Sequence, residues 1–202
     1  MLALLAPVAA LPWLQGFFVP YAATERGSPD VIAELAQWRA PAANCVGDAY
    51  GGLSLRVDLA PTAGRERIVA SYSQGMFVLD AENHVLAQAT GFACQGASDE
   101  LVAIAAGDAA IGTPVIALAA TSGGRVESTT WLTLYRVSNG GELQPVFIGE
   151  VERHANQTTR TGTVTLIPGG LVYLDPAGTL SLWTYDAELG RYVERLTNRP
   201  YA

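Results

Sequence analysis

The two cysteines are the residues of this sequence whose chemistry is easiest to define. Cys45 and Cys94 are the whole supply of thiols, and no CxxC pair occurs. A structural zinc site would need both of them together with His84 and His154, and the spacing typical of such sites is missing. In an oxidising compartment we expect one Cys45–Cys94 disulfide, which would close a loop of roughly 50 residues and stabilise the fold by about 3–4 kcal/mol. In a cytosolic protein the same pair would be two buried thiols.

Nucleophilic catalysis has little support in the sequence. A Ser-His-Asp triad would need His84 or His154, the two histidines, together with an activated serine. His84 falls in a predicted hairpin turn, His154 falls in the polar stretch ERHANQTTRT, and no G-x-S-x-G elbow is present. The SYSQG stretch at residues 71–75 is interpreted as a turn. The chain contains no lysine, which excludes Schiff-base chemistry and a P-loop lysine.

Two pairs of carboxylates have the residue types that glycoside hydrolysis uses, Asp80 with Glu82 and Asp186 with Glu188. Both pairs fall in predicted hairpin turns, where exposure to solvent favours a turn role. No glycine-centred series of oxygen ligands follows Asp80, as a calcium loop would require. G-x-G-x-x-G is also absent. We therefore expect no catalytic residue, no bound metal and no cofactor.

The composition favours a folded domain that does not bind nucleic acid. Half of the 202 residues are hydrophobic and 15% are charged, which is typical of a chain with a sizeable core. The 19 acidic residues outnumber the 12 basic ones and give a net charge of -7. A phosphate backbone would be repelled by this charge, so nucleic acid is excluded as an expected partner.

The chain begins with an apolar segment, which we treat as a leader at residues 1–24. Its first 23 residues carry no charged side chain and read MLALLAPVAALPWLQGFFVPYAA. Three interpretations stay open: an export signal, a membrane anchor, or a part of the mature fold. The apolar core and small residues favour export, whereas three prolines would interrupt a spanning helix. We expect an exported protein, periplasmic or extracellular, with membrane association through residues 1–23 if the leader is retained.

Residues 25–50 are expected to hold one short amphipathic helix and a linker. The sequence SPDVIAELAQWRAP supplies a capping serine, a proline suited to the first helical position and an early aspartate. Apolar residues at helical spacing would form one stripe, made of Val31, Leu35 and Trp38. These signals predict a helix over residues 29–39, ended by Pro41.

Residues 51–202 are expected to form an all-β repeat domain. Strand-forming runs alternate with Gly, Pro, Asn and Asp turns, and they group into three meanders of four strands each. The first meander is predicted at residues 53–59, 67–73, 76–80 and 84–90. The second is predicted at residues 101–106, 114–120, 129–137 and 143–151. The third is predicted at residues 161–167, 171–174, 180–185 and 192–196.

The third strand, turn and fourth strand of each meander form a phrase that recurs about every 50 residues. The three phrases include VLDAENHVL, LYRVSNGGEL and WTYDAELGRYV. On these phrases the chain resembles β-propeller repeat proteins over about residues 53–196, without the Trp-Asp ending or the calcium loops of some of their repeats. The resemblance implies three blade-like meanders, and because closed propellers usually have at least four blades, an open edge that a partner or second copy would close. A β-sandwich or barrel is the alternative architecture.

Four aromatic side chains on the predicted third strands are candidate interaction residues: Trp131, Tyr135, Trp183 and Tyr185. They could pack between blades or form a platform on which a sugar stacks. Together these features favour a non-catalytic, exported binding or assembly module with a protein partner, such as an accessory subunit of a larger membrane-associated complex. The alternatives are a carboxylate-based glycan hydrolase and a solitary secreted ligand-binding domain.

Overall fold

The fold is all-β, with two short helices among the described residues. The computed structural model describes residues 11–17, 19–23, 25–26, 30–59, 65–138 and 140–198. These residues form three sheets, and each sheet contains four consecutive strands joined as an antiparallel meander. The three predicted meanders are therefore confirmed, and all twelve of their strands lie within a few residues of the predicted bounds.

Each sheet is named here by its order along the chain. The first sheet contains β3 (Glu25–Arg26), β4 (Leu53–Val57), β5 (Glu66–Ser71), β6 (Gly75–Leu79) and β7 (Val85–Ala89). The second contains β2 (Val19–Ala23), β8 (Glu100–Asp108), β9 (Pro114–Gly123), β10 (Glu127–Val137), β11 (Leu143–Ala155) and β12 (Thr158–Thr161). The third contains β1 (Leu14–Gln15), β13 (Thr163–Ile167), β14 (Gly170–Leu174), β15 (Leu180–Asp186) and β16 (Arg191–Asn198).

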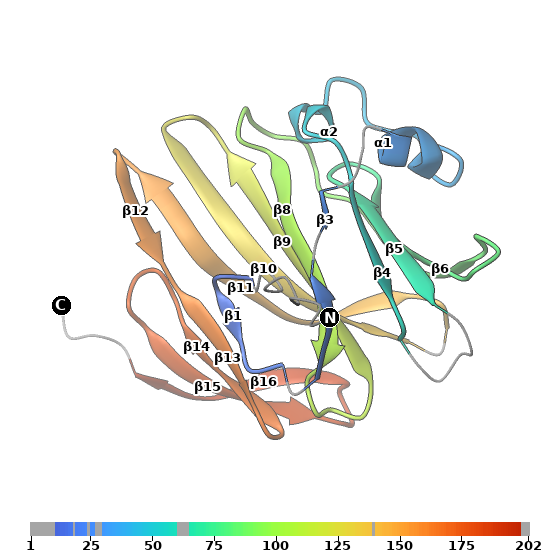
Figure 1. Ribbon diagram of the computed structural model, residues 1–202. Coiled ribbons are helices and arrows are strands. Elements are labelled where there is room, and N and C mark those ends of the chain that lie inside the picture. Colours follow the sequence, from blue (N-terminus) through green and yellow to red (C-terminus); the bar gives the residue numbers. More distant parts are fainter. Residues whose placement is uncertain are drawn as a thin grey trace, which may run out of the picture.

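The N-terminal segment contributes one strand to every sheet. β1 pairs in parallel with β13, β2 pairs antiparallel with β8, and β3 pairs antiparallel with β4. Each of them thus adds to the first strand of a meander, and Figure 1 shows β1 beside β13. Three apolar residues near the start of the described chain are buried in the protein core: Leu11, Trp13 and Leu14.

This segment coincides with the leader predicted at residues 1–24. Residues 1–10, 18 and 24 of that leader lie outside the described residues, and the remainder includes β1 and β2. Its use as an export signal or a membrane anchor stays a prediction. Among the described residues, no helix has both the length and the apolar character needed to cross a membrane.

The three sheets stack face to face in chain order and enclose two apolar cores (Figure 1). Strand β9, in the middle of the second sheet, is covered on both faces, which explains why it is apolar almost throughout. The β9 side chains that pack toward the first sheet are those of Ile116, Leu118 and Ala120. Those that pack toward the third sheet are Val115, Ala117 and Ala119.

Helix α1 (Asp30–Leu35) covers the outer face of the first sheet. Its Val31 and Leu35 are buried against three residues of β5 and β6: Val69, Phe77 and Leu79. Glu34 also receives two hydrogen bonds from the Arg67 guanidinium, at 2.8 and 2.6 Å. The end of the stack beyond the first sheet is therefore closed by the chain itself.

The helix is shorter than the predicted span of residues 29–39. The backbone amides of Trp38 and Arg39 both donate to the Leu35 carbonyl, at 3.0 Å each, so the last turn does not continue as a regular helix. The Arg39 side chain reaches the first sheet and donates to the Ala89 carbonyl at 2.9 Å, which fixes the direction of the chain. A second helix, α2 (Val46–Ala49), was not predicted.

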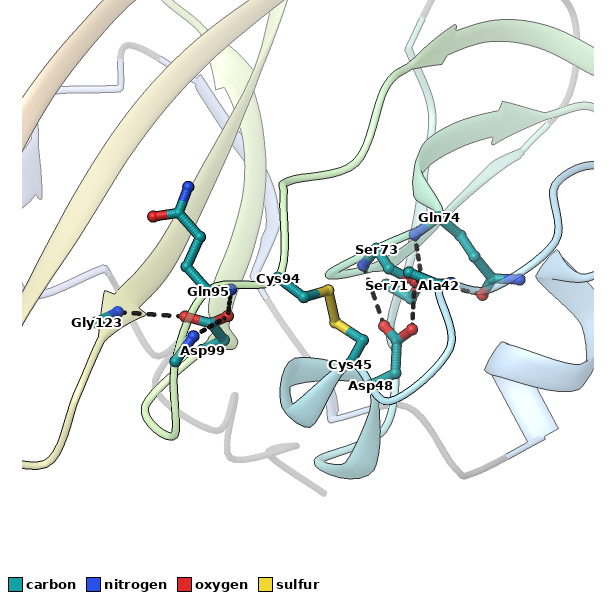
Figure 2. Close-up of a disulfide and its surroundings, with 11 residues drawn as sticks. Ala42, Cys45, Asp48, Ser71, Ser73, Gln74, Cys94, Gln95, Asp99 and Gly123 are labelled. Atoms are coloured by element: carbon teal, nitrogen blue, oxygen red, sulfur yellow. Dashed lines mark hydrogen bonds between the residues drawn. A yellow bond between two sulfur atoms is a disulfide. The ribbon is translucent and has the colours of Figure 1, made fainter.

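The predicted Cys45–Cys94 disulfide is present, with the two Cα atoms 5.3 Å apart (Figure 2). It joins the start of α2 to the segment between β7 and β8, and hence to the connection between the first and second sheets. A carboxylate lies on each side of it. Asp48 accepts hydrogen bonds from the amide and hydroxyl of Ser73. The buried Asp99 accepts three backbone amides, from Gln95, Gly96 and Gly123.

Replacing both cysteines, in a Cys45→Ala/Cys94→Ala variant, should lower the free energy of unfolding by about 2–4 kcal/mol, because the unfolded chain loses a cross-link between residues 49 apart. Urea denaturation followed by circular dichroism measures the change. A reductant should weaken the wild type by a similar amount and leave the variant unaffected. A loss below about 1 kcal/mol would show that the bond does not constrain the unfolded chain as expected.

A second prediction concerns Tyr192, in the core between the second and third sheets. Its hydroxyl is buried and has no hydrogen-bond partner among the described residues, whereas the Tyr173 hydroxyl donates to the Glu150 carbonyl at 2.7 Å. Because Tyr192→Phe removes a buried, unpaired polar atom, it should leave stability unchanged or increase it. Tyr173→Phe should cost about 1 kcal/mol.

The same tyrosine predicts a pH effect. Burial, together with the nearby Tyr185, raises the pKa of Tyr192 to about 12. The unfolded chain therefore loses this proton first, and wild-type stability should fall as the pH rises from about 10 to 12. Tyr192→Phe should show a smaller fall. Equal slopes in the two proteins, measured by urea denaturation, would contradict this assignment.

Candidate functional site

The four aromatic residues selected from the sequence do not gather into one surface. Tyr135 is only 8% exposed and belongs to the core between the first and second sheets. Trp183 and Tyr185 pack against the core between the second and third sheets. Trp131, 41% exposed, is the one of the four that is presented to solvent. A shared platform is therefore absent, because the strands that carry these residues are covered on different faces.

The partners of the two half-buried aromatics explain their structural role. The Trp183 indole donates to the Ser181 hydroxyl at 2.7 Å and meets the Phe147 ring edge-on, with centroids 5.3 Å apart. The Tyr185 hydroxyl accepts a hydrogen bond from Arg136 at 3.1 Å. These contacts join the second and third sheets, which is the packing role expected for aromatics between layers.

Trp131 lines a groove of about 310 Å³ between the second and third sheets, called here the Trp131 groove. Ile148 of β11 lies on the same wall, and the turn between β14 and β15, with Asp175 and Pro176, lies on the other. At Gly149 a Cβ atom would come within 3.1 Å of the Tyr173 ring. The absence of a side chain there allows this ring to approach the strand closely.

Four charged side chains also line the Trp131 groove: Glu150, Arg153, Arg160 and Asp175. Arg153 on β11 and Arg160 on β12 are directly opposite each other in the ladder, where like charges repel. Glu150 binds Arg153 at 2.6 Å and stabilises its charge, which raises the pKa of that arginine. Asp175 accepts the Thr179 amide at 2.7 Å, which fixes the turn.

Tyr173 does not have the properties of a proton-transfer residue. Burial, with the charges of Asp175 and Glu150, raises the pKa of its phenol well above the usual range, and its hydroxyl already donates to the Glu150 carbonyl. It stays neutral near pH 7 and fixes the shape of the groove. The geometry of the Trp131 groove therefore suits binding through stacking, donors and acceptors.

Two further cavities are more polar. One, of about 390 Å³, lies between β7 and the β10–β11 hairpin and includes Arg39. That guanidinium is already engaged by backbone carbonyls. The other, of about 340 Å³, includes His154, whose Nδ1 lies 3.1 Å from the Thr159 hydroxyl oxygen.

The carboxylate pairs considered for hydrolysis lie in hairpin turns, as predicted. Asp80 accepts the backbone amides of Glu82 and His84 at 2.9 and 2.7 Å, and its second oxygen lies 3.1 Å from the His84 ring. Asp186 accepts the amides of Glu188 and Leu189 at 3.1 and 3.0 Å. Each aspartate thus stabilises its own turn, a common use of this side chain.

The outer face of the third sheet is apolar and is called here the open face. Strand register places seven apolar side chains on it: Ile167, Val172, Leu174, Leu180, Leu182, Val193 and Leu196. None of them belongs to a buried apolar cluster of the described residues, and Leu180 and Leu196 are 45% and 67% exposed. The open face was not predicted, although the sequence carries a signal for it: the strands of the third meander have apolar residues at both odd and even positions.

Charged groups lie beside these apolar side chains. Arg195 donates to the Thr184 hydroxyl at 2.8 Å, and its guanidinium lies 3.6 Å from Asp186. Register places Thr184 on the open face beside Val193, so one edge of that face carries both an acid and a base.

No protein-family model matches this chain, and no curated protein matches it significantly.

Proposed function

We propose that this chain is a non-catalytic, exported assembly module that docks a second copy of itself through the open face. The observation that carries the proposal is the row of apolar side chains on the outer face of the third sheet, of which Leu180 and Leu196 are exposed and the other five are partly buried. Contiguous apolar surface of this kind is typical of protein–protein contacts. In this proposal the three sheets are the blades of an incomplete β-propeller, and the second copy covers the last blade.

The stacking of the sheets favours a second copy over an extended filament. A head-to-tail contact would need the open face of one molecule to meet the far end of the next, and α1 covers that end. The open face can instead meet its own copy about a two-fold axis, which makes a closed dimer. Such a dimer would have six sheets in one stack.

The size of the face predicts a weak dimer. Its four meander strands have 5, 5, 7 and 8 residues. At about 3.3 Å per residue and about 4.8 Å between strands, the face spans roughly 400 Å² in projection. Side-chain relief increases the accessible area toward roughly 600 Å² per partner, the low end of specific interfaces. We therefore expect a dissociation constant in the micromolar range.

The charged side chains beside the open face are compatible with self-association. Asp186 and Arg195 occur on the same edge, so a two-fold axis can bring the acid of one copy to the base of the other. Each chain carries a net charge of -7, so the two copies repel at long range. Salt should screen this repulsion and strengthen the dimer.

Export is supported by the disulfide, since such bonds persist in oxidising compartments. The absence of an enzymatic role in this proposal rests on the turn-stabilising contacts of Asp80 and Asp186 and on the engaged phenol of Tyr173.

The test is sedimentation velocity of the purified chain between about 1 and 500 μM, a range that brackets micromolar affinity. Wild type should dimerise with increasing concentration, and Leu196→Glu should remain monomeric because a charge would be buried in the contact. Val126→Glu is the matched control, because Val126 has the same 67% exposure but lies in the β9–β10 turn. It should dimerise like wild type.

Two results would overturn the proposal: a wild-type chain that stays monomeric at every concentration, or a dimer that Leu196→Glu leaves intact. Circular dichroism must show the same fold in all three proteins. Both substituted side chains are exposed in the monomer, so we expect their stabilities to differ from wild type by less than about 0.5 kcal/mol.

A further inference from the structure

We propose that the Trp131 groove binds a neutral saccharide, with one sugar ring stacked on the Trp131 indole. The proposal concerns a surface separate from the open face and does not depend on dimerisation. It starts from the exposure of Trp131, which is 41% exposed at the rim of a concavity of about 310 Å³. That volume is at the lower limit of small-ligand sites, and it suits one or two sugar rings.

The aromatic side chain supplies a flat apolar surface at a fixed position. Trp131 lies at a β-bulge in the β10–β11 ladder, directly opposite Glu150. Bulges often redirect a side chain near a functional site. Ile148, 56% exposed, extends the same wall. The CH face of a pyranose is apolar and would cover this surface, whereas its hydroxyls point to the sides.

The polar groups around the Trp131 groove match those hydroxyls. Arg153 and Arg160 offer donors, and Glu150 and Asp175 offer acceptors. Arg153 is already bound to Glu150 at 2.6 Å, whereas Arg160 is exposed on the edge strand β12. A sugar hydroxyl can donate to a carboxylate and accept from a guanidinium at once, so the mixed lining is satisfied by a polyol.

The charge balance distinguishes a neutral sugar from an anion. Two arginines and two carboxylates give the lining a formal charge of zero, and the chain as a whole carries -7. An anionic ligand would approach against this field. A neutral sugar ring is not repelled by this field, and it can make both the stacking contact and the hydrogen bonds.

The groove is also preorganised. Tyr173 packs edge-on against Phe147, with centroids 5.4 Å apart, and its hydroxyl is fixed by the Glu150 carbonyl. The turn that carries Asp175 is closed by the Gly178 amide at 2.9 Å and the Thr179 amide at 2.7 Å. Little ordering is therefore needed on binding, which favours affinity for a small ligand.

The test is isothermal titration of the intact chain with three neutral probes, maltotriose, cellotriose and chitotriose, and one acidic probe, a glucuronic-acid disaccharide. We expect saturable binding of at least one neutral probe. Trp131→Ala should weaken it about tenfold through the lost stacking contact. Arg160→Gln should weaken it severalfold. Tyr50→Ala is the control, because Tyr50 is an exposed aromatic that lines a different cavity.

The proposal is overturned by any of three results: no saturable binding of a neutral probe, binding of the acidic probe alone, or equal affinity in Trp131→Ala and wild type. Leu196→Glu should bind the probe like wild type. That comparison separates this proposal from dimerisation, since the failure of one leaves the result for the other unchanged.

Discussion

Backbone hydrogen bonding at the first strand of each meander is the constraint on which this structure depends. Those strands, β4, β8 and β13, would otherwise leave a row of amides and carbonyls unpaired at three sheet edges. The N-terminal segment provides hydrogen-bond partners at all three edges, because β1 pairs with β13, β2 with β8 and β3 with β4. Since the segment is continuous in sequence, it also ties the three sheets to one another. The two apolar cores lie between sheets that the N-terminal segment also joins at these edges.

Coverage of the sheet faces follows from this stacking and determines where function is expected. The central strand β9 of the second sheet has a core on each side, and the outer face of the first sheet is covered by α1. The third sheet has one face in a core, and the apolar residues of its other face, such as Val172, Leu182 and Leu196, belong to none of the apolar clusters of the described residues. Exposing an apolar face to water has a free-energy cost, and this cost decreases when a partner covers the face. The proposed dimer contact uses this face, whereas the Trp131 groove is lined by residues of both the second and the third sheet.

Local patterns predicted the twelve meander strands, because alternation and turns such as Ser138–Gly141 and Asp175–Gly178 are visible in short windows. β1, β2 and β3 escaped prediction because their partners lie far away in sequence and their apolar character is equally typical of a leader. β12 was missed because its turn uses Asn156 and Gln157, both at positive φ, and glutamine gives no turn signal there. The Trp131 groove needs the pairing of β12 with β11, so it could not be predicted either.

The contacts that hold neighbouring sheets together differ in number and kind, and this difference affects which sheet opens most easily. The first and second sheets share a disulfide-bonded connection, with Asp48 and Asp99 fixing the chain on either side of it. The third sheet has no disulfide to the second sheet; it is held by the core between them, by side-chain hydrogen bonds of Tyr173 and Tyr185, and by the two-residue strand β1. A protein opens locally where the fewest contacts must be broken, so the free energy of local opening should be lower for the third sheet than for the other two. A second copy on the open face would oppose that opening, because binding stabilises the closed form. Assembly and stability of the third sheet are then two consequences of the same exposed surface.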